Sequence, residues 1–278
     1  QNLRRDIYGS DAVTGKVREV IHLPTNSWLP LLTAAVLAVV CVSLLVKVYL
    51  IALVAAVVAL LLVLRWGWEN GAHPRAAPVR ADDPVDPPLH SRTCDGPGLW
   101  GMVISLMANG TLYVSLLFGW FYLWTAAPQW STPETSPLAL IPLAVSGALL
   151  ALAVSIYRIA VSRLRKGNDG SLSLQLWAVS AIGLTHWCLL GWVLKTSSLQ
   201  PTELAHDAVL AVALYYLLLH SGLAVIFTAL QALRVKLGYV GARVPYEPIV
   251  IQAFWVYTLG VFWLSFAMFL LLPMAWGA

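Results

Sequence analysis

The hydrophobic residues of this chain are gathered into long runs that alternate with short polar segments. Each run reaches about 20 residues, the length that an α-helix needs to cross a hydrocarbon core about 30 Å thick. Backbone polar groups inside lipid must be paired within the segment, and the alternating pattern of barrel strands is absent. The sequence therefore predicts seven transmembrane helices, at 28–46, 48–66, 99–125, 138–162, 172–194, 208–233 and 249–274.

The boundary between the first two runs is the least marked, because only Lys47 separates them. A single helix from Trp28 to Trp66 would be about 58 Å long, nearly twice the thickness of a bilayer core. With seven helices, all but two of the 17 Lys and Arg residues lie on the side of the N-terminus, the exceptions being Lys47 and Lys195. By the positive-inside rule, this distribution favours two helices, a cytoplasmic N-terminus and a C-terminus outside.

The same pattern divides the chain into four regions. Residues 1–27 form a polar cytoplasmic lead, 28–66 a two-helix hairpin, 67–98 a linker rich in Pro and Asp, and 99–278 a five-helix bundle. The predicted fold is an all-α membrane protein with seven transmembrane helices, the first two a hairpin. Only 11% of the residues are charged, against about a quarter in soluble domains, which agrees with this class. Because the chain begins at Gln1 and lacks a signal-peptide pattern, we expect a processed N-terminus or a piece of a longer polypeptide.

No pattern typical of a hydrolytic, nucleotide-binding or redox site is found in the sequence. The three cysteines are far apart and form no CxxC pair. Of six histidines, only His186 and His220 lie well inside predicted spans. Two such imidazoles could hold a haem between adjacent helices. The alternative, which we favour, is that each forms a hydrogen bond with a neighbouring helix. We therefore predict no catalytic, cofactor-binding or metal-binding residue in this chain.

Ionisable side chains in the hydrophobic core mark ion and proton paths, and these spans contain almost none. The third span instead contains Ser105 and Asn109, which are four residues apart and share one face of the helix. We expect intramembrane polar contacts at Ser105, His186 and His220, most simply hydrogen bonds between helices. The small net charge of +4 indicates no nucleic-acid partner.

Several stretches resemble subunit III of the haem-copper cytochrome c oxidases. The similar segments are Leu99–Ile104 and Phe118–Tyr122 in the third helix, the Pro-rich loop 125–137 after it, Ser146-Gly147 in the fourth helix, Gly222–Ile226 in the sixth, and Trp263-Leu264 in the seventh. The polar stretch His22–Trp28, followed by two helices and a long loop, is similar to the junction in fused subunit I–III polypeptides.

The chain departs from that family at its polar positions. Asn109 stands where the family's third helix has a glutamate. Ser221 and Ala224 stand where the sixth helix has two histidines, and Tyr257 and Gly260 where the last helix has a histidine and an aspartate. The resemblance is therefore closer in architecture than in polar residues.

The resemblance implies a non-catalytic subunit III, or the subunit III part of a fusion, in an aa3-type cytochrome c oxidase of a bacterial plasma (inner) membrane. Such a chain contacts the haem-copper subunit I and subunit II, and binds phospholipids between its first two helices and the rest. It supports proton uptake and stability during turnover, while haem a and copper lie in the partner subunits. The nearer alternative is subunit III of a quinol oxidase or a nitric-oxide-reductase accessory protein, and the more distant one is a solitary seven-helix transporter or sensor.

Overall fold

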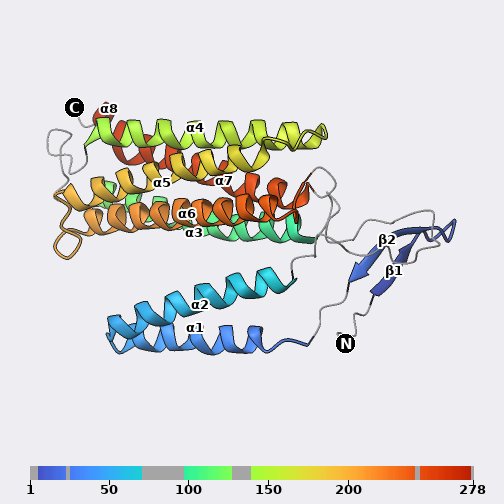
Figure 1. Cartoon of the computed structure of the whole chain (residues 1–278). Coiled ribbons are helices and arrows are strands. Elements are labelled where there is room, and N and C mark those ends of the chain that lie inside the picture. The colour runs from blue at the N-terminus through green and yellow to red at the C-terminus, as the bar shows by residue number, and fades with distance from the viewer. Residues whose placement is uncertain (1–5, 23–25, 71–96, 127–138, 242–244, 277–278) are drawn as a thin grey trace. The chain divides into compact units, whose positions relative to one another are not determined.

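The computed structural model describes residues 6–22, 26–70, 97–126, 139–241 and 245–276 (Figure 1). Most of these residues are helical, and their contacts divide the chain into an N-terminal unit, residues 1–91, and a C-terminal unit, residues 92–278. The linker predicted over 67–98 and the Pro-rich loop at 125–137 fall almost wholly outside the described residues.

The N-terminal unit begins with a short β-hairpin that the sequence analysis missed. Strand β1 (Asp6–Ser10) pairs in antiparallel fashion with β2 (Val17–His22), where only a polar lead was predicted. The Asp11 carboxylate accepts hydrogen bonds from the backbone N–H groups of Val13, at 2.8 Å, and Thr14, at 2.9 Å. These two hydrogen bonds lower the pKa of Asp11, because they stabilise the ionised carboxylate; the bond from Thr14 has the larger effect.

Two helices complete this unit, α1 (Leu29–Leu45) and α2 (Tyr49–Asn70), and they pack against each other. The chain turns between them at Lys47, whose φ of 61° lies in the left-handed region that few non-glycine residues adopt. The break falls where the sequence predicted the end of one helix and the start of the next. Small buried residues recur on one face of α2, which allows close helix approach; they are Ala52, Ala55 and Ala59.

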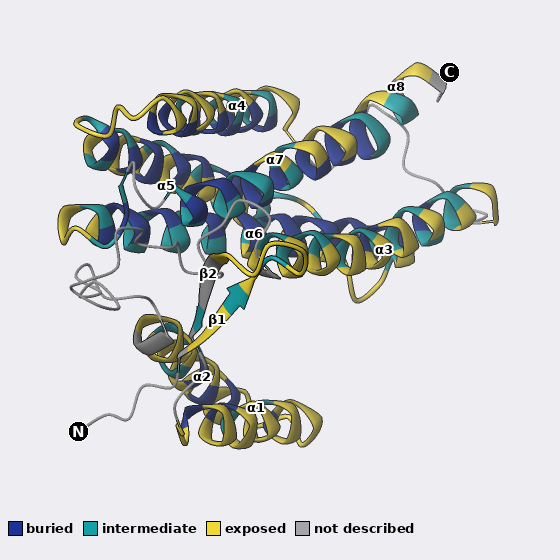
Figure 2. Cartoon of the chain, turned by 90° about the vertical axis from the view of Figure 1, so that its right-hand side faces the viewer, coloured by how far each residue is buried: buried dark blue, intermediate teal, exposed yellow. Residues whose placement is uncertain are grey.

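The C-terminal unit is a bundle of long helices, with neighbours in sequence running antiparallel (Figure 1). They are α3 (Pro97–Ala126), α4 (Leu140–Arg165), α5 (Leu172–Thr196), α6 (Ala205–Lys236) and α7 (Tyr246–Phe266). Helix α5 packs between α4 and α6, while α7 contacts α3, α4 and α6. Figure 2 shows buried residues concentrated on the inner faces of α4 to α7, whereas α3 is mostly exposed or half-buried.

The last helix changes its hydrogen-bonding pattern near its end. Helix α7 continues through a π-helical turn, η3 (Ala267–Leu271), into α8 (Leu272–Trp276). Pro273 has no backbone N–H and its ring crowds the carbonyl group of Phe269, four residues earlier. Widening the preceding turn relieves this conflict while the chain stays helical.

Among the described residues, six helices, α2 to α7 with its extension to Leu271, are long and apolar enough to cross a membrane. Helix α1 is shorter, with 17 residues. The chain is thus a multi-pass membrane protein with an all-α bundle, as predicted, and each helix lies within a few residues of its predicted range.

Three glycines in the C-terminal unit lie directly beneath aromatic rings of other helices. A Cβ atom added at any of them would meet a ring atom at 3.0 Å or less, closer than ordinary van der Waals contact. The pairs are Gly147 with Phe262 at 2.5 Å, Gly183 with Trp255 at 2.8 Å, and Gly222 with Trp187 at 3.0 Å. These contacts join α4 to α7, α5 to α7, and α6 to α5, so glycine sets the helix spacing here.

Candidate functional site

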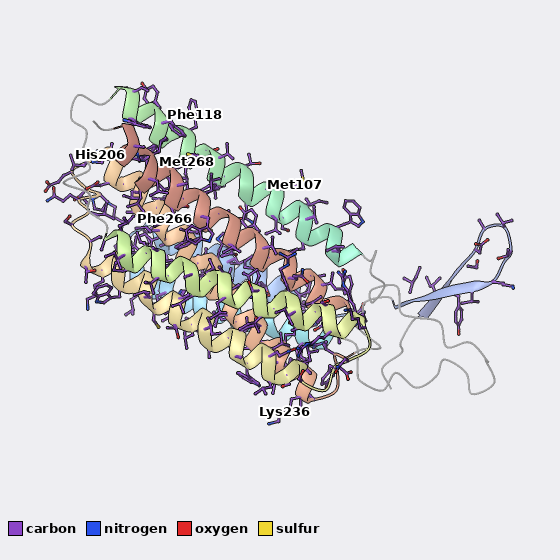
Figure 3. The ribbon with its side chains drawn as sticks, turned by 90° about the horizontal axis from the view of Figure 1, so that it is seen from above. Met107, Phe118, His206, Lys236, Phe266 and Met268 are labelled. Atoms are coloured by element: carbon purple, nitrogen blue, oxygen red, sulfur yellow. The ribbon has the colours of Figure 1, made fainter. Side chains whose placement is uncertain are left out.

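Buried polar side chains of the C-terminal unit follow α6 from end to end. Helix α6 contacts α3, α5 and α7, which explains why one of its faces can be buried along its whole length. Its buried polar residues are His206, Asp207, His220, Ser221, Thr228, Gln231 and Arg234. Figure 3 shows His206 and Lys236 at opposite ends of this helix. The polar contacts form layers along the helix, from its middle to its two ends.

The middle layer contains Asn109, the position matched to the family's carboxylate. The Tyr216 hydroxyl lies 3.3 Å from the Asn109 carbonyl oxygen and 2.6 Å from the Tyr257 hydroxyl. Because a hydroxyl carries one proton, Tyr216 donates to the carbonyl group and accepts from Tyr257. This chain of hydrogen bonds joins α3, α6 and α7.

The Asn109 side chain itself stays within α3. Its Nδ2 donates to the Ser105 carbonyl oxygen at 2.9 Å, one turn earlier. The two residues therefore share a face, but the Ser105 side chain is exposed and only its backbone takes part. The hydrogen bond to a neighbouring helix is accepted by the Asn109 backbone carbonyl group, and the amide side chain takes no part in it.

A second hydroxyl pair lies one turn farther along α3. The Tyr113 and Ser265 hydroxyl oxygens are 2.7 Å apart, and Ser265 donates to the Val261 carbonyl group at 2.8 Å. Tyr113 is therefore the donor in the pair. The Tyr113 ring also lies beside that of Tyr216, with centroids 5.8 Å apart. We call Asn109, Tyr113, Tyr216, Tyr257 and Ser265 the tyrosine seam.

His220 adjoins the tyrosine seam on α6. Its Nδ1 lies 2.9 Å from the Tyr216 carbonyl oxygen of the same helix, which places a proton on that nitrogen. Its ring stacks on Phe254 of α7, with centroids 5.6 Å apart and an interplanar angle of 10°. His220 thus contacts α7 by ring stacking, and its Nδ1 hydrogen bond is local.

His186 is placed differently, between α5 and α4. Its Nδ1 lies 2.9 Å from the Ser146 carbonyl oxygen and 2.8 Å from the Ser146 hydroxyl. Its ring meets Phe262 edge-on, with centroids 5.5 Å apart. His186 and His220 therefore have different ring neighbours and different hydrogen-bond partners. Within the described ranges, no group of three or more His, Cys, Asp or Glu residues could hold a metal ion.

Another polar layer lies toward the C-terminal end of α6. The Tyr157 hydroxyl of α4 donates to the Gln231 carbonyl oxygen Oε1. One turn away, the Trp255 Nε1–H donates to the Thr228 hydroxyl at 2.8 Å, and Thr228 donates to the Ala224 carbonyl group. These side chains are buried, so their hydrogen bonds fix α4 and α7 against α6.

Each end of α6 carries a pair of ionisable side chains. At the C-terminal end, Arg234 donates from Nε to Glu247 Oε2 at 2.9 Å and from Nη2 to Oε1 at 2.6 Å, a bidentate ion pair. At the N-terminal end, the Asp207 carboxylate lies 3.2 Å from His206 Nε2 and accepts the Gln200 backbone N–H at 2.9 Å. Both pairs lie near helix ends, where charged groups can reach the membrane surface.

The buried tyrosines Tyr113, Tyr157 and Tyr216, and Gln231, were not among the residues predicted to make polar contacts. These three tyrosines lie inside apolar runs, where the aromatic ring does not interrupt the hydrophobic pattern. The available signal was the hydroxyl group, which needs a hydrogen-bond partner when it is buried in a membrane.

Replacing Tyr216 by phenylalanine is expected to lower the free energy of unfolding by about 1 kcal/mol. The change removes one hydroxyl and leaves the Asn109 carbonyl group and the Tyr257 hydroxyl without their shared partner. Unfolding in mixed micelles, followed by circular dichroism, measures the effect. Tyr215→Phe is the matched control, because Tyr215 is 62% exposed on the same helix and should lose much less. Equal losses in the two variants would contradict a role for the tyrosine seam.

No protein-family model matches this chain, and no curated protein matches its sequence.

Proposed function

We propose that this chain is subunit III, or the subunit III part of a fused polypeptide, of a bacterial aa3-type cytochrome c oxidase. The tyrosine seam carries the proposal. Asn109 and Tyr257 were matched, from sequence alone, to a glutamate and a histidine of that family. In the fold they lie on either side of one hydroxyl, that of Tyr216, although 148 residues of sequence separate them. Such proximity is expected if the matched positions are structurally equivalent, and it supports the alignment.

Two further matched motifs fall at contacts between helices. Ser146 holds His186, and Gly147 lies beneath the Phe262 ring with Trp263 beside it. Gly222 lies beneath Trp187. Residues that a family fold needs for packing are expected at such places, so these contacts support the same architecture.

The proposal includes seven spans with the N-terminus in the cytoplasm. Helix α1 is about 26 Å long, slightly less than a typical hydrocarbon core, and α2 runs back beside it. In the C-terminal unit, the described basic residues gather at one end, formed by the end of α4 and the end of α6. They are Arg158, Arg163, Arg165, Lys166, Arg234 and Lys236, with only Lys195 at the other end. By the positive-inside rule, this distribution supports a cytoplasmic location for the basic end.

Single cysteines on opposite loops test this orientation. In a chain whose native cysteines are replaced by serine, Thr202→Cys is expected to react with an impermeant thiol reagent added from outside. Asn168→Cys is expected to react only after the membrane is opened. Both positions are exposed, so access from one side decides the result. The reverse labelling would overturn the proposed orientation.

In this role the chain packs against the haem-copper subunit and shields it from lipid, and it supplies no redox group. Haem a and copper belong to the partner subunits, and the chain covers a flank of the haem-copper subunit that would otherwise meet lipid. The buried layers of α6 keep the bundle rigid while its outer faces remain apolar. Proton uptake would be supported indirectly, through the charged cytoplasmic loops near the entry point.

The test is purification in mild detergent, followed by activity measurements. A haem-copper subunit is expected to co-purify with the chain. Enzyme lacking residues 99–278 should keep its haem spectrum and initial rate of oxygen consumption, but lose activity over repeated turnovers. Comparison at equal amounts of spectrally intact enzyme isolates this effect. Absence of any co-purifying haem-copper subunit would refute the proposal, and immediate loss of all activity with intact haems would show a direct catalytic role instead.

A further inference from the structure

Four polar residues lie along one side of the end of α4, between its buried face and its outward apolar residues. They are Arg158, Ser162, Arg165 and Lys166, and all four are exposed. Their spacing of four, three and one residues places them on neighbouring positions of one helix side. We call these residues the α4 basic face.

Arg158 lies deepest of the four. It precedes Arg165, at the end of α4, by two turns, or about 10 Å along the axis. Exposed Ile159 follows it directly in the sequence, so the aliphatic part of the Arg158 side chain lies beside an apolar position that faces away from the bundle. A guanidinium at this depth must reach the headgroup layer or find a partner, because an unpaired charge in hydrocarbon is costly.

The protein does not provide that partner in its described part. There, neither Arg158 nor Arg165 nor Lys166 has an ion pair or hydrogen bond to another side chain, whereas Arg234 at the same end is paired with Glu247. The α4 basic face therefore presents three positive charges outward.

An apolar stripe runs along α4 beside this face, about a quarter of a turn around the helix. Its exposed members are Ile141, Val145, Leu152 and Ile159, which recur at spacings of four and seven residues. Such spacing keeps them on one side of the helix. The opposite side of α4 packs on α5 and α7, so the stripe faces away from the bundle.

We propose that the α4 basic face binds the headgroup of a phospholipid with net negative charge, such as phosphatidylglycerol. Arg158 and Arg165 contact the phosphodiester oxygens from two depths, Ser162 donates a hydrogen bond between them, and Lys166 adds charge at the surface. The acyl chains lie along Leu152 and Ile159. A zwitterionic lipid fits less well, because its headgroup adds a positive charge beside three cations. This site consists of α4 residues alone and differs from lipid held between the first two helices and the rest.

The test compares phosphatidylglycerol with phosphatidylcholine of the same acyl chains, using the full chain in detergent and native mass spectrometry of bound lipid. The wild type is expected to prefer phosphatidylglycerol. Arg158→Gln with Arg165→Gln should reduce this preference by about fivefold for each charge removed. Arg158→Gln alone should lose about half of that effect on a logarithmic scale. Circular dichroism checks that each variant keeps its helices.

Lys195→Gln with Lys236→Gln is the matched control, because it also removes two exposed charges, both outside the α4 basic face. It is expected to keep the preference. An equal loss in this control would show general surface charge and overturn the site. Unchanged preference in the arginine variants would do the same. Inorganic phosphate at equal concentration should not displace the lipid, and full displacement would mean that the face binds free phosphate instead.

Discussion

Replacing Glu247 by alanine is expected to destabilise the C-terminal unit by about 3 kcal/mol, because it leaves a buried guanidinium without its counterion. Arg234 is buried and makes two short hydrogen bonds to the Glu247 carboxylate. The Arg234 guanidinium also lies 5.1 Å from the centre of the Tyr239 ring. The Glu247 side chain is 34% exposed, so water partly compensates, and the loss falls at the lower end of the range for buried pairs.

Unfolding in mixed micelles measures this loss, and two further variants define its origin. Glu203→Ala removes an exposed carboxylate outside the pair and is expected to change stability by less than about 0.5 kcal/mol. Arg234→Met with Glu247→Ala removes both charges and should recover much of the loss, because the buried charge is gone. A double variant as unstable as Glu247→Ala would show that packing, not the unpaired charge, is responsible.

Replacing Trp255 by alanine is expected to be the most damaging single change in the bundle, costing about 3 to 5 kcal/mol. Trp255 is completely buried and lies over Gly183. The change leaves a large cavity where α5, α6 and α7 meet. It also leaves the Thr228 hydroxyl without its indole donor.

Trp263→Ala on the same helix is the control for Trp255→Ala. Its side chain is 39% exposed, so its removal leaves a smaller cavity and should cost clearly less. Trp255→Phe keeps part of the ring volume but not the indole N–H, and should lie between the two. A loss for Trp255→Ala no greater than that for Trp263→Ala would contradict the central position of Trp255.

The helices could be predicted from the sequence because burial in lipid imposes one simple requirement, a long apolar run. Lys47 was enough to place the break between α1 and α2, since one continuous helix would have exceeded the membrane. The β-hairpin was missed because its strands are short and the alternation of Ile7, Val20 and Ile21 with polar residues is weak. A segment of that length gives little periodic signal.

The partners of the polar residues could not be predicted in the same way. Spacing along a helix shows which residues share a face, as for Ser105 and Asn109, but not which helix that face meets. His186 pairs with Ser146, 40 residues earlier, and Tyr216 with Tyr257, 41 residues later. These pairings depend on how the five helices are arranged, and that arrangement cannot be predicted from the residue pattern of a single sequence.

The glycines beneath aromatic rings have an evolutionary consequence. Each glycine leaves the space that the ring occupies, so a larger residue at Gly147 requires a smaller residue at Phe262 and a shift of the neighbouring Trp263 ring. The same reciprocity applies to Gly183 with Trp255 and to Gly222 with Trp187. In relatives of this chain, these pairs are therefore expected to covary, and the first substitution of each pair should be deleterious until the second follows.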